Sequence, residues 1–337
     1  MIMNTQLDNK ISHDNSNNLT SELILSYKER AEKGDTEAQR ILANAYYHGI
    51  VVEKDKNSAL FWLKKAAESG DLRALELLGT AYLKGDILEK DEEKGFHLLI
   101  KASVSRSVQV IARLGLCYEL GIGVSTDIDK AMLLYTEAES KGSDLAKFRL
   151  ALIYDQGKYN IEKDLFKAFS YILSLSRAGY PPALEMMGKY CMKGNVIAQN
   201  PQRAIKYFEL AMQLGRIPSC YYLGKIYGEG KYVAMDKVKA FEYYKKGAAG
   251  NYPKAWVSLG LAYCKGDGVE KNYSEAMNCF KKAAVLNDSY GYYFMGIMYV
   301  DKRLNIYNKQ TAIKYFKVAA QLGNKKALEK LNTTFMP

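Results

Sequence analysis

Residues 259–284 read LGLAYCKGDGVEKNYSEAMNCFKKAA, and this stretch shows the positions that recur along the chain. Its first step, Leu259-Gly260, has counterparts 36 residues apart, with one interval of 37. The counterparts are Leu42-Ala43, Leu78-Gly79, Leu114-Gly115, Leu150-Ala151, Met187-Gly188, Leu223-Gly224 and Met295-Gly296. Eight copies of one pattern at a nearly constant spacing indicate a repeat protein, in which each copy packs on its neighbours.

Further positions keep the same phase. Three residues after the small residue of the step stand Tyr46, Tyr82, Tyr118, Tyr154, Cys191, Tyr227, Tyr263 and Tyr299. Three residues later stand Gly49, Gly85, Gly121, Gly157, Gly194, Gly230 and Gly266, with Lys302 in the last repeat. A second small residue follows at Ala59, Gly95, Ala131, Ala168, Ala204, Ala240, Ala276 and Ala312. The single extra residue lies between Gly157 and Ala168, in a predicted loop where an insertion costs little.

The spacing inside one repeat is helical. In the sixth repeat, apolar or small residues stand at i, i+4, i+7 and i+8 on a first helix and recur on a second. They are Ser219, Leu223, Ile226 and Tyr227, then Ala240, Tyr243, Tyr244, Gly247 and Ala248. Gly224 is predicted to let the two helices approach closely. Gly230 is predicted to end the first helix in the left-handed conformation that glycine adopts readily.

Each second helix has a polar start signal. Four residues before its small residue stand Asp55, Asp91, Asp127, Asp164, Asn200, Asp236, Asn272 and Asn308. Such side chains accept hydrogen bonds from the free amides of a first helical turn, worth about 1 kcal/mol each. An aspartate there also suits the positive end of the helix dipole. Because the phase is fixed, we interpret these residues as caps and not as catalytic acids.

These patterns predict an all-α fold. We expect a right-handed α-solenoid of about eight 36-residue helix-turn-helix repeats over residues 19–337, preceded by a disordered tail at 1–18. The predicted repeats are 36–71, 72–107, 108–143, 144–180, 181–216, 217–251, 252–288 and 289–324, followed by a cap helix at 325–337. A single helix at Thr20–Lys33 and another at Lys325–Leu331 resemble half-repeats that cap the two ends.

The consensus is small-x-x-x-Leu-Gly-x-x-Tyr-x-x-Gly-x-Gly-Val, then Asp-x-x-Lys-Ala and Ala-Ala, as in LGLAYCKGDGVEKNYSEAMNCFKKAA. It resembles the Sel-one-like repeat, a branch of the tetratricopeptide repeat superfamily, over about residues 36–324. The resemblance implies a non-catalytic scaffold or adaptor that assembles other proteins. A cysteine-rich secreted branch of the family has a regular cysteine pair in each repeat. This chain lacks that pairing, so the properties of that branch are not transferred.

By analogy with tetratricopeptide repeats, the first helices should line a concave groove that binds a partner. The groove positions lie three residues before and one, four and five residues after the small residue of the step. In the first half they are Arg40, Asn44, Tyr47, Glu76, Thr80, Leu83, Leu116, Leu120, Phe148 and Leu152. In the second half they are Lys189, Met192, Tyr221, Lys225, Tyr293 and Ile297, and the projection also covers Val257 and Leu261.

Two features of this groove suggest the kind of partner. Leu116, Leu120, Phe148 and Leu152 would form an apolar patch, and Lys189, Lys193 and Lys225 would lie near Met192 and Tyr221. Apolar anchors beside lysines suit an extended or helical peptide with acidic residues. The alternative is that these side chains only tighten the packing between repeats. Gly228 also falls at a groove position, and one hypothesis is that it makes room for a bulky partner side chain.

Composition and motifs argue against several other classes. The five cysteines are irregularly spaced without a C-x-x-C, and the three histidines are not clustered with them, so no disulfide framework or zinc site is expected. The segment GKIYGEGKY, 224–232, is not a phosphate loop, because Lys225 stands where a glycine is needed and Tyr232 where Ser or Thr is needed. No catalytic set, cofactor site or metal site is predicted, and no small-molecule substrate is expected.

The absence of an apolar run of 18 residues predicts no membrane span. The polar N-terminus predicts no secretory signal, and we expect a cytoplasmic protein, which a specialised secretion system could also deliver out of the cell.

Alternatives to a cytoplasmic scaffold remain open. The same fold could act as a secreted effector on host cells or as an immunity protein that neutralises a toxin. Residues 181–337 carry 24 Lys+Arg against 11 Asp+Glu, a net +13, whereas residues 1–180 carry 24 against 26, a net −2. A basic half could bind nucleic acid, with lysines alternating with tyrosines. Tyr207, Tyr243 and Tyr244 are in phase with the core face, which argues against base stacking.

Overall fold

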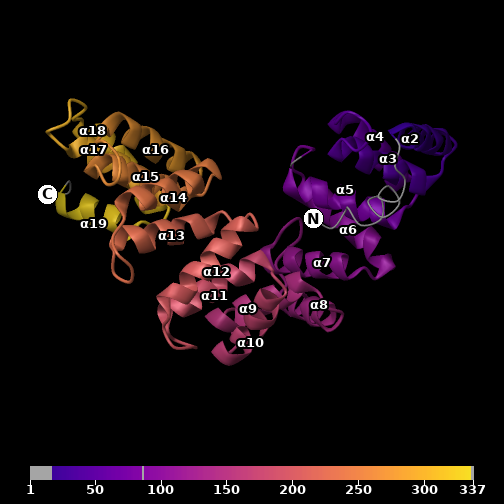
Figure 1. The fold of residues 1–337 in the computed structure, drawn as a ribbon, viewed down its shortest axis with the longest axis horizontal. Helices are drawn as coiled ribbons and strands as arrows, with labels where there is room; N and C mark the ends of the chain where they lie inside the picture. Colours follow the sequence, from indigo (N-terminus) through magenta and orange to yellow (C-terminus); the bar gives the residue numbers. More distant parts are fainter. Residues whose placement is uncertain (1–16, 86, 335–337) are drawn as a thin grey trace. The chain divides into compact units, whose positions relative to one another are not determined.

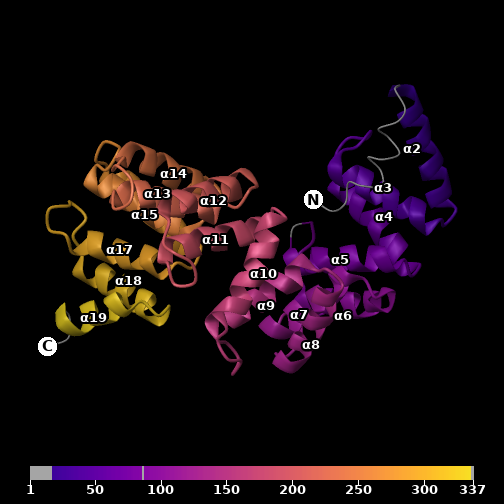
Figure 2. The same ribbon diagram turned by 60° about the horizontal axis from the view of Figure 1, so that its bottom comes forward.

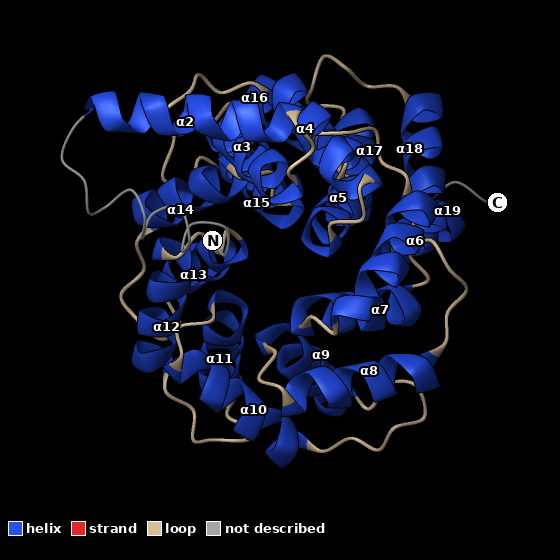
Figure 3. Cartoon of the chain, turned by 90° about the vertical axis from the view of Figure 1, so that its right-hand side faces the viewer, coloured by secondary structure: helices blue, strands red, loops and turns tan. Residues whose placement is uncertain are grey.

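The computed structural model describes residues 17–85 and 87–334 of the 337-residue chain. This part of the chain forms eighteen α-helices, one 3₁₀-helix and no β-strand (Figure 3). The predicted all-α architecture of repeated helical hairpins is confirmed. Of the tail predicted at 1–18, residues 1–16 lie outside the described residues, and the first described helix begins at Asn17.

The chain divides into two compact units between Asp164 and Leu165. In the first unit, α2 corresponds to the predicted front cap, and three complete hairpins follow before α9 (Figures 1 and 2). The helices are α2 (Asn17–Glu32), α3 (Thr36–His48), α4 (Lys56–Glu68), α5 (Leu72–Lys84), α6 (Glu92–Ala102), the 3₁₀-helix η1 (Ser103–Ser105), α7 (Val108–Leu120), α8 (Ile128–Ser140) and α9 (Asp144–Gln156).

The second unit begins with the second helix of repeat four and contains four complete hairpins and the rear cap (Figure 2). Its helices are α10 (Leu165–Arg177), α11 (Pro181–Lys193), α12 (Pro201–Gln213), α13 (Pro218–Glu229), α14 (Lys237–Ala249), α15 (Pro253–Lys265), α16 (Tyr273–Val285), α17 (Ser289–Val300), α18 (Lys309–Gln321) and α19 (Lys325–Thr334).

The ends of the helices follow the predicted signals. Asp236 accepts a hydrogen bond from the Lys239 amide at 2.8 Å, and six further predicted caps accept one in the same way. Asp164 stands at the same place before α10. The seven predicted terminal glycines all have a positive φ, between 62° at Gly230 and 77° at Gly266. Seven of the eight first helices therefore end, and all eight second helices begin, at residues that the period specifies.

The glycine of the first helix allows close packing within a hairpin. A Cβ on Gly224 would lie 2.6 Å from Cε1 of Tyr244, which stands on the second helix of the same repeat. The same relation joins Gly188 to Phe208 and Gly260 to Phe280, each also at 2.6 Å. The prediction that Gly224 lets the two helices approach closely is confirmed, because the aromatic ring occupies the space of the missing side chain.

Neighbouring repeats also pack closely on each other at their loops. A Cβ on Gly123, the second glycine of the Gly-x-Gly-Val loop in repeat three, would lie 2.0 Å from the Glu92 carbonyl oxygen of repeat two. Gly268 stands in the same relation, at 2.1 Å, to the carbonyl oxygen of Lys237. Backbone therefore packs directly on backbone at these two repeat boundaries.

Gly228 does not provide open space for a partner. A Cβ at this position would lie 3.3 Å from Cβ of Ala240 and 3.6 Å from the hydroxyl oxygen of Tyr244. Position 228 thus faces α14 of its own hairpin, and the hypothesis that it makes room for a partner side chain is wrong.

None of the described helices combines the length and the apolar character that crossing a lipid bilayer requires.

Candidate functional site: a polar pocket on the first helices

All sixteen predicted groove residues lie on first helices, as the projection requires. Glu76 is buried, Leu120 and Lys225 are exposed, and the other thirteen side chains are partly exposed. A partly exposed position is open to a partner but also contributes to packing, so burial alone does not separate the two interpretations. The contacts of each residue do so better.

Five of the six residues predicted in repeats one and two line one pocket of about 510 Å³ in the first unit. Those five are Arg40, Asn44 and Tyr47 on α3, and Glu76 and Thr80 on α5. The sixth, Leu83, packs inward, because a Cβ on Gly95 of α6 would lie 2.6 Å from its Cδ2 atom. The structure therefore brings most of the predicted residues of these repeats to a single site.

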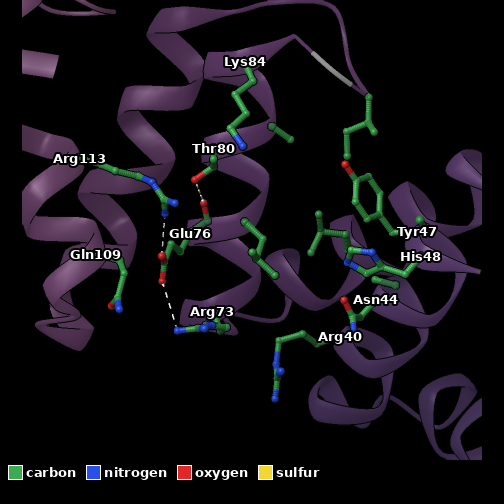
Figure 4. A pocket seen from close by; sticks show the side chains of 16 residues that line it. Arg40, Asn44, Tyr47, His48, Arg73, Glu76, Thr80, Lys84, Gln109 and Arg113 are labelled. Carbon is green, nitrogen blue, oxygen red and sulfur yellow. Dashed lines mark hydrogen bonds and ion pairs between the residues drawn. The ribbon is translucent and has the colours of Figure 1, made fainter. Parts of the chain in front are cut away.

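The pocket is shared by the first helices of three consecutive repeats (Figure 4). Side chains of α3 lie on one side of it, and those of α5 and α7 lie on the other. Its apolar lining comes from Ala43, Ala59, Leu63, Leu77, Ala81 and Ile87. The site thus combines an apolar lining with charged residues from neighbouring repeats, which is the usual composition of a ligand pocket.

Glu76 is the acidic residue of the pocket. It is 5% exposed, and Nη1 of Arg113, on the next first helix, donates to Oε1 of Glu76 at 2.8 Å. Arg73 Nη1 lies 3.7 Å from the other carboxylate oxygen, Oε2 (Figure 4). The Thr80 hydroxyl donates to the backbone carbonyl of Glu76 at 2.8 Å. A buried carboxylate is stable only when paired in this way, so Glu76 links repeats two and three.

Basic residues outnumber the acidic one in the pocket lining. Arg40, Arg73, Lys84 and Arg113 stand against Glu76, four cations to one anion. Within the described chain, no ion pair involves Lys84. Arg40 Nε lies 3.8 Å from Oδ2 of Asp71, which is an ion-pair distance but too long for a hydrogen bond. The pocket therefore keeps a positive charge after its internal pairs are counted.

Three buried side-chain atoms on α3 have no hydrogen-bond partner among the described residues, namely Oε1 of Gln39, Nε of Arg40 and Oδ1 of Asn44. The last two, a donor and an acceptor, belong to residues that line the pocket. The two residues stand one helical turn apart on the wall of the pocket. A buried polar atom without a partner costs about 1–3 kcal/mol, so this pair needs an explanation.

The apolar patch predicted on α7 and α9 lies in the same unit. Leu120 is 50% exposed, while Leu116, Phe148 and Leu152 are partly exposed. Beside these positions is a second buried carboxylate, Glu119 of α7. Tyr135 donates to it at 2.7 Å, and burial first, then the nearby Glu119 carboxylate, raises the pKa of Tyr135. Like Glu76, Glu119 connects two repeats, through Arg149 of α9.

In the second unit, the predicted groove residues contact their neighbours extensively. Lys189 forms an ion pair with buried Glu185 and stands 4.9 Å above the Tyr222 ring. The Tyr221 ring lies 5.8 Å from that of Tyr252. Lys225 forms an exposed ion pair with Glu229 at 3.6 Å.

At the rear of this unit, the ring of Tyr293 lies 5.8 Å from that of Phe316, and Ile297 packs on the same terminal core. Met192 packs on the core around Phe208. These contacts show that the positions contribute to packing. Their role in binding a partner stays a prediction.

Among the polar residues of the pocket, the sequence projection missed three and covered the positions of two others without naming them. Arg73 and Gln109 stand six residues before the small residue of their repeats, one turn N-terminal to the projected stripe. Extending the stripe by that turn would have found both. Lys84 and His48 hold the fifth position after it, which the projection covers, but in these two repeats only the fourth-position residues Leu83 and Tyr47 were named. No feature of the sequence indicated Arg113, because this residue gains its role only through the contact with Glu76 of the preceding repeat.

The remaining titratable groups show packing roles. Burial raises the pKa of the Cys117 thiol to about 11 and that of Cys279 to about 12, as expected of cysteines within a core. In residues 17–85 and 87–334, no three His, Cys, Asp or Glu side chains are grouped so that they could hold a metal ion. Tyr243 of the basic half stacks on Tyr227, with ring centroids 5.8 Å apart, and the Tyr244 ring lies against Gly224.

Comparison with known proteins identifies the repeat. The family model described as "Sel1 repeat" matches residues 36–71, 72–103, 109–143, 144–180, 181–215, 217–252, 257–288 and 289–324. No curated protein matches the chain.

Among solved structures, a Sel1 repeat protein from Oxalobacter formigenes is 26% identical, with 84% of this chain and 82% of that chain covered and a TM-score of 0.56. A protective antigen of uropathogenic Escherichia coli strains, described as displaying an SLR fold, is 22% identical, covers 93% of this chain and 67% of its own, and has a TM-score of 0.55. An immunity protein of Pseudomonas aeruginosa is 21% identical over 68% of this chain and 88% of its own, with a TM-score of 0.47. The matched repeats extend over most of the sequence and coincide with the helical hairpins of the structure, so this chain belongs to the Sel1 repeat family.

Proposed function

We propose that this protein is a non-catalytic scaffold that binds a partner protein through the exposed face of its first helices. The observation that carries the proposal is the pocket on α3, α5 and α7, because three repeats contribute charged and unpaired polar side chains to one site. Glu76 and Arg113 pair between repeats, but packing of the hairpins does not account for the other charged and polar side chains of the pocket. The repeated glycines, tyrosines and caps already account for the fold.

The first-helix face also differs from repeat to repeat, unlike the core. The position three residues before the small residue holds Arg40, Glu76, Ala112, Phe148, Glu185, Tyr221, Val257 and Tyr293. Glu76, Ala112, Glu185 and Val257 are buried, so this variation changes the contact surface in the other four repeats, where the side chain is partly exposed. Function on a repeat fold is carried by side chains of this kind, and a partner that spans several repeats would meet a specific sequence of them.

The test is to capture a partner with the tagged full-length chain from a lysate of the source organism and to map the complex by hydrogen–deuterium exchange. Mass spectrometry identifies the partner, which is then purified for the exchange measurement. We expect slower exchange in α3, α5 and α7 on binding, with α6 and α8 unchanged. Protection confined to the second helices, or no stoichiometric partner, would contradict the proposal.

Single-site variants then test which residues of the first helices contact the partner. Phe148→Glu and Lys225→Glu, made separately, test the predicted apolar patch and the predicted lysine. The matched control is Lys101→Glu, which places the same charge on an exposed residue of second helix α6. Each variant is first shown by circular dichroism to be folded. Partner recovery equal to that of the control variant would remove that residue from the binding face.

A further inference from the structure

We infer that the pocket on α3, α5 and α7 binds an extended segment of the partner and that acidic side chains of this segment pair with Lys84 and Arg40. The inference rests on the proposed scaffold function and adds the chemical class of the ligand. It comes from the two properties of the pocket that its internal contacts leave unexplained, namely its excess positive charge and its unpaired polar atoms.

The charge defines the side chains of the ligand. Arg113 and Arg73 both point at Glu76, so this carboxylate partly neutralises them (Figure 4). Lys84 makes no ion pair within the described chain, and the Arg40 guanidinium reaches Asp71 only at 3.8 Å. An added carboxylate at either place would form a charge-assisted hydrogen bond in a partly desolvated site. A neutral or basic ligand would leave these cations uncompensated.

The unpaired atoms define the backbone of the ligand. Arg40 Nε can donate one hydrogen bond and Asn44 Oδ1 can accept one, and both atoms are buried in the pocket wall. One residue of an extended segment supplies the complementary pair, a carbonyl oxygen for Arg40 and an N–H for Asn44, because both groups of that residue point to the same side of the chain. In an extended segment these groups are free, whereas in a helix they are already bonded within the chain. The two atoms therefore favour an extended segment over a helical one.

The separation of the two remaining cations requires more than one acidic side chain. Lys84 and Arg40 lie at opposite ends of the pocket (Figure 4). One carboxylate cannot contact both ends. Between them the apolar lining of Leu63 and Leu77 would accept an apolar side chain. The expected ligand is a segment with two acidic residues separated by several positions that include an apolar one.

The experiment uses the full-length protein and an oriented library of acetylated, amidated decapeptides with Asp, Glu, Asn, Gln, Lys, Leu and Phe varied at each position. Blocked ends exclude a terminal carboxylate as the source of charge. We expect the wild-type chain to select Asp or Glu at two positions. Lys84→Gln should abolish the selection at one of them and weaken the best peptide by about 10-fold, and Arg40→Gln should abolish the selection at the other.

Two controls make the result specific to the pocket. Lys101→Gln removes an exposed lysine outside the pocket and should leave the selection unchanged. Asn44→Ala should weaken all selected peptides without changing their acidic preference, because it removes a backbone contact. Selection without acidic residues, retention of no peptide, or equal loss in Lys101→Gln would each overturn the inference. The scaffold proposal would survive that failure if α3, α5 and α7 still gain protection in the complex with the whole partner.

Discussion

Glu119 and Arg149 connect two consecutive repeats through a bidentate ion pair, with Nε of Arg149 2.9 Å from one carboxylate oxygen and Nη2 2.5 Å from the other. The Glu119 side chain is almost completely buried, and the hydroxyl groups of Tyr135 and Tyr159 also donate to it. Glu76 with Arg113 forms a comparable pair between repeats two and three, and Glu185 pairs with Arg216 at the end of its own repeat. In the first unit, the buried carboxylates Glu76 and Glu119 are therefore each held by an arginine of the next repeat.

Removing the arginine should cost far more than losing a surface ion pair. Arg149→Met leaves the Glu119 carboxylate buried without its cation, and we expect the free energy of unfolding to fall by about 3–5 kcal/mol. Urea denaturation followed by circular dichroism measures it. Arg303→Met is the matched control, because its pair with Asp301 is exposed, and it should change stability little. Equal effects of the two substitutions would show that burial of Glu119 has no energetic consequence.

Gly224 should not tolerate alanine while Tyr244 remains. A Cβ at position 224 would lie 2.6 Å from the tyrosine ring, so Gly224→Ala should destabilise the protein by about 1–3 kcal/mol through overpacking. In repeat one, Ala43 and Leu63 stand at the corresponding positions and both are buried in one core. Adding Tyr244→Leu should therefore lower the cost of Gly224→Ala, and a double-mutant cycle measures this coupling. Additive effects of the two substitutions would contradict the packing argument.

The terminal glycines Gly230 and Gly266 offer a matched comparison of strain and crowding. Both have a left-handed backbone, with φ of 62° and 77°, so alanine at either should cost about 1–2 kcal/mol. A Cβ at Gly230 would lie 2.7 Å from Cβ of Met235, whereas at Gly266 the nearest atom is 3.6 Å away. Gly230→Ala should therefore lower the thermal midpoint more than Gly266→Ala. The reverse order would mean that the loop at Met235 can shift away from the added Cβ without a cost in free energy.

Stability should decrease at alkaline pH in part through Cys279. Burial raises the pKa of this thiol from 9.0 to about 12 in the folded protein. Because the folded-state pKa lies above the unfolded value, the contribution of the protonated thiol is fully present below pH 9 and is lost as the pH rises from 9 towards 12. Urea midpoints at pH 8 and pH 10.5 test this, and Cys279→Ala should show the smaller loss between them. Equal losses in wild type and variant would exclude the thiol as a cause.

The fold was predictable because its determinants repeat. Gly230 and Asp236 could be assigned as caps only because the same residue types stand in phase in the other repeats, and the structure gives both the predicted geometry. Gly228 shows the limit of such reasoning. It has no counterpart in the period, and its orientation towards Ala240 depends on the packing of one hairpin. For a residue outside the period, only the structure shows which neighbours it faces.

The site was predictable only in part, because it consists of side chains that do not recur. The projection placed Arg40 and Asn44 on the correct face, since a helical stripe follows from spacing alone. It could not show that Glu76 is buried, because the Arg113 guanidinium that stabilises it comes from the next repeat. The pocket likewise depends on how α3, α5 and α7 stack, and no single repeat encodes it.

The ion pair between Glu76 and Arg113 also has a consequence for how the gene can change in length. Arg149 holds in repeat four the position that Arg113 holds in repeat three, two residues before the small residue. Loss of codons 108–143 would bring Arg149 opposite Glu76 and would remove Glu119 together with its repeat, so every remaining buried carboxylate of the first unit would keep an arginine. Duplication of the same segment would add one carboxylate and one arginine in the correct order. Recombination can therefore shorten or lengthen the protein at repeat three in a single step without creating an unpaired buried charge.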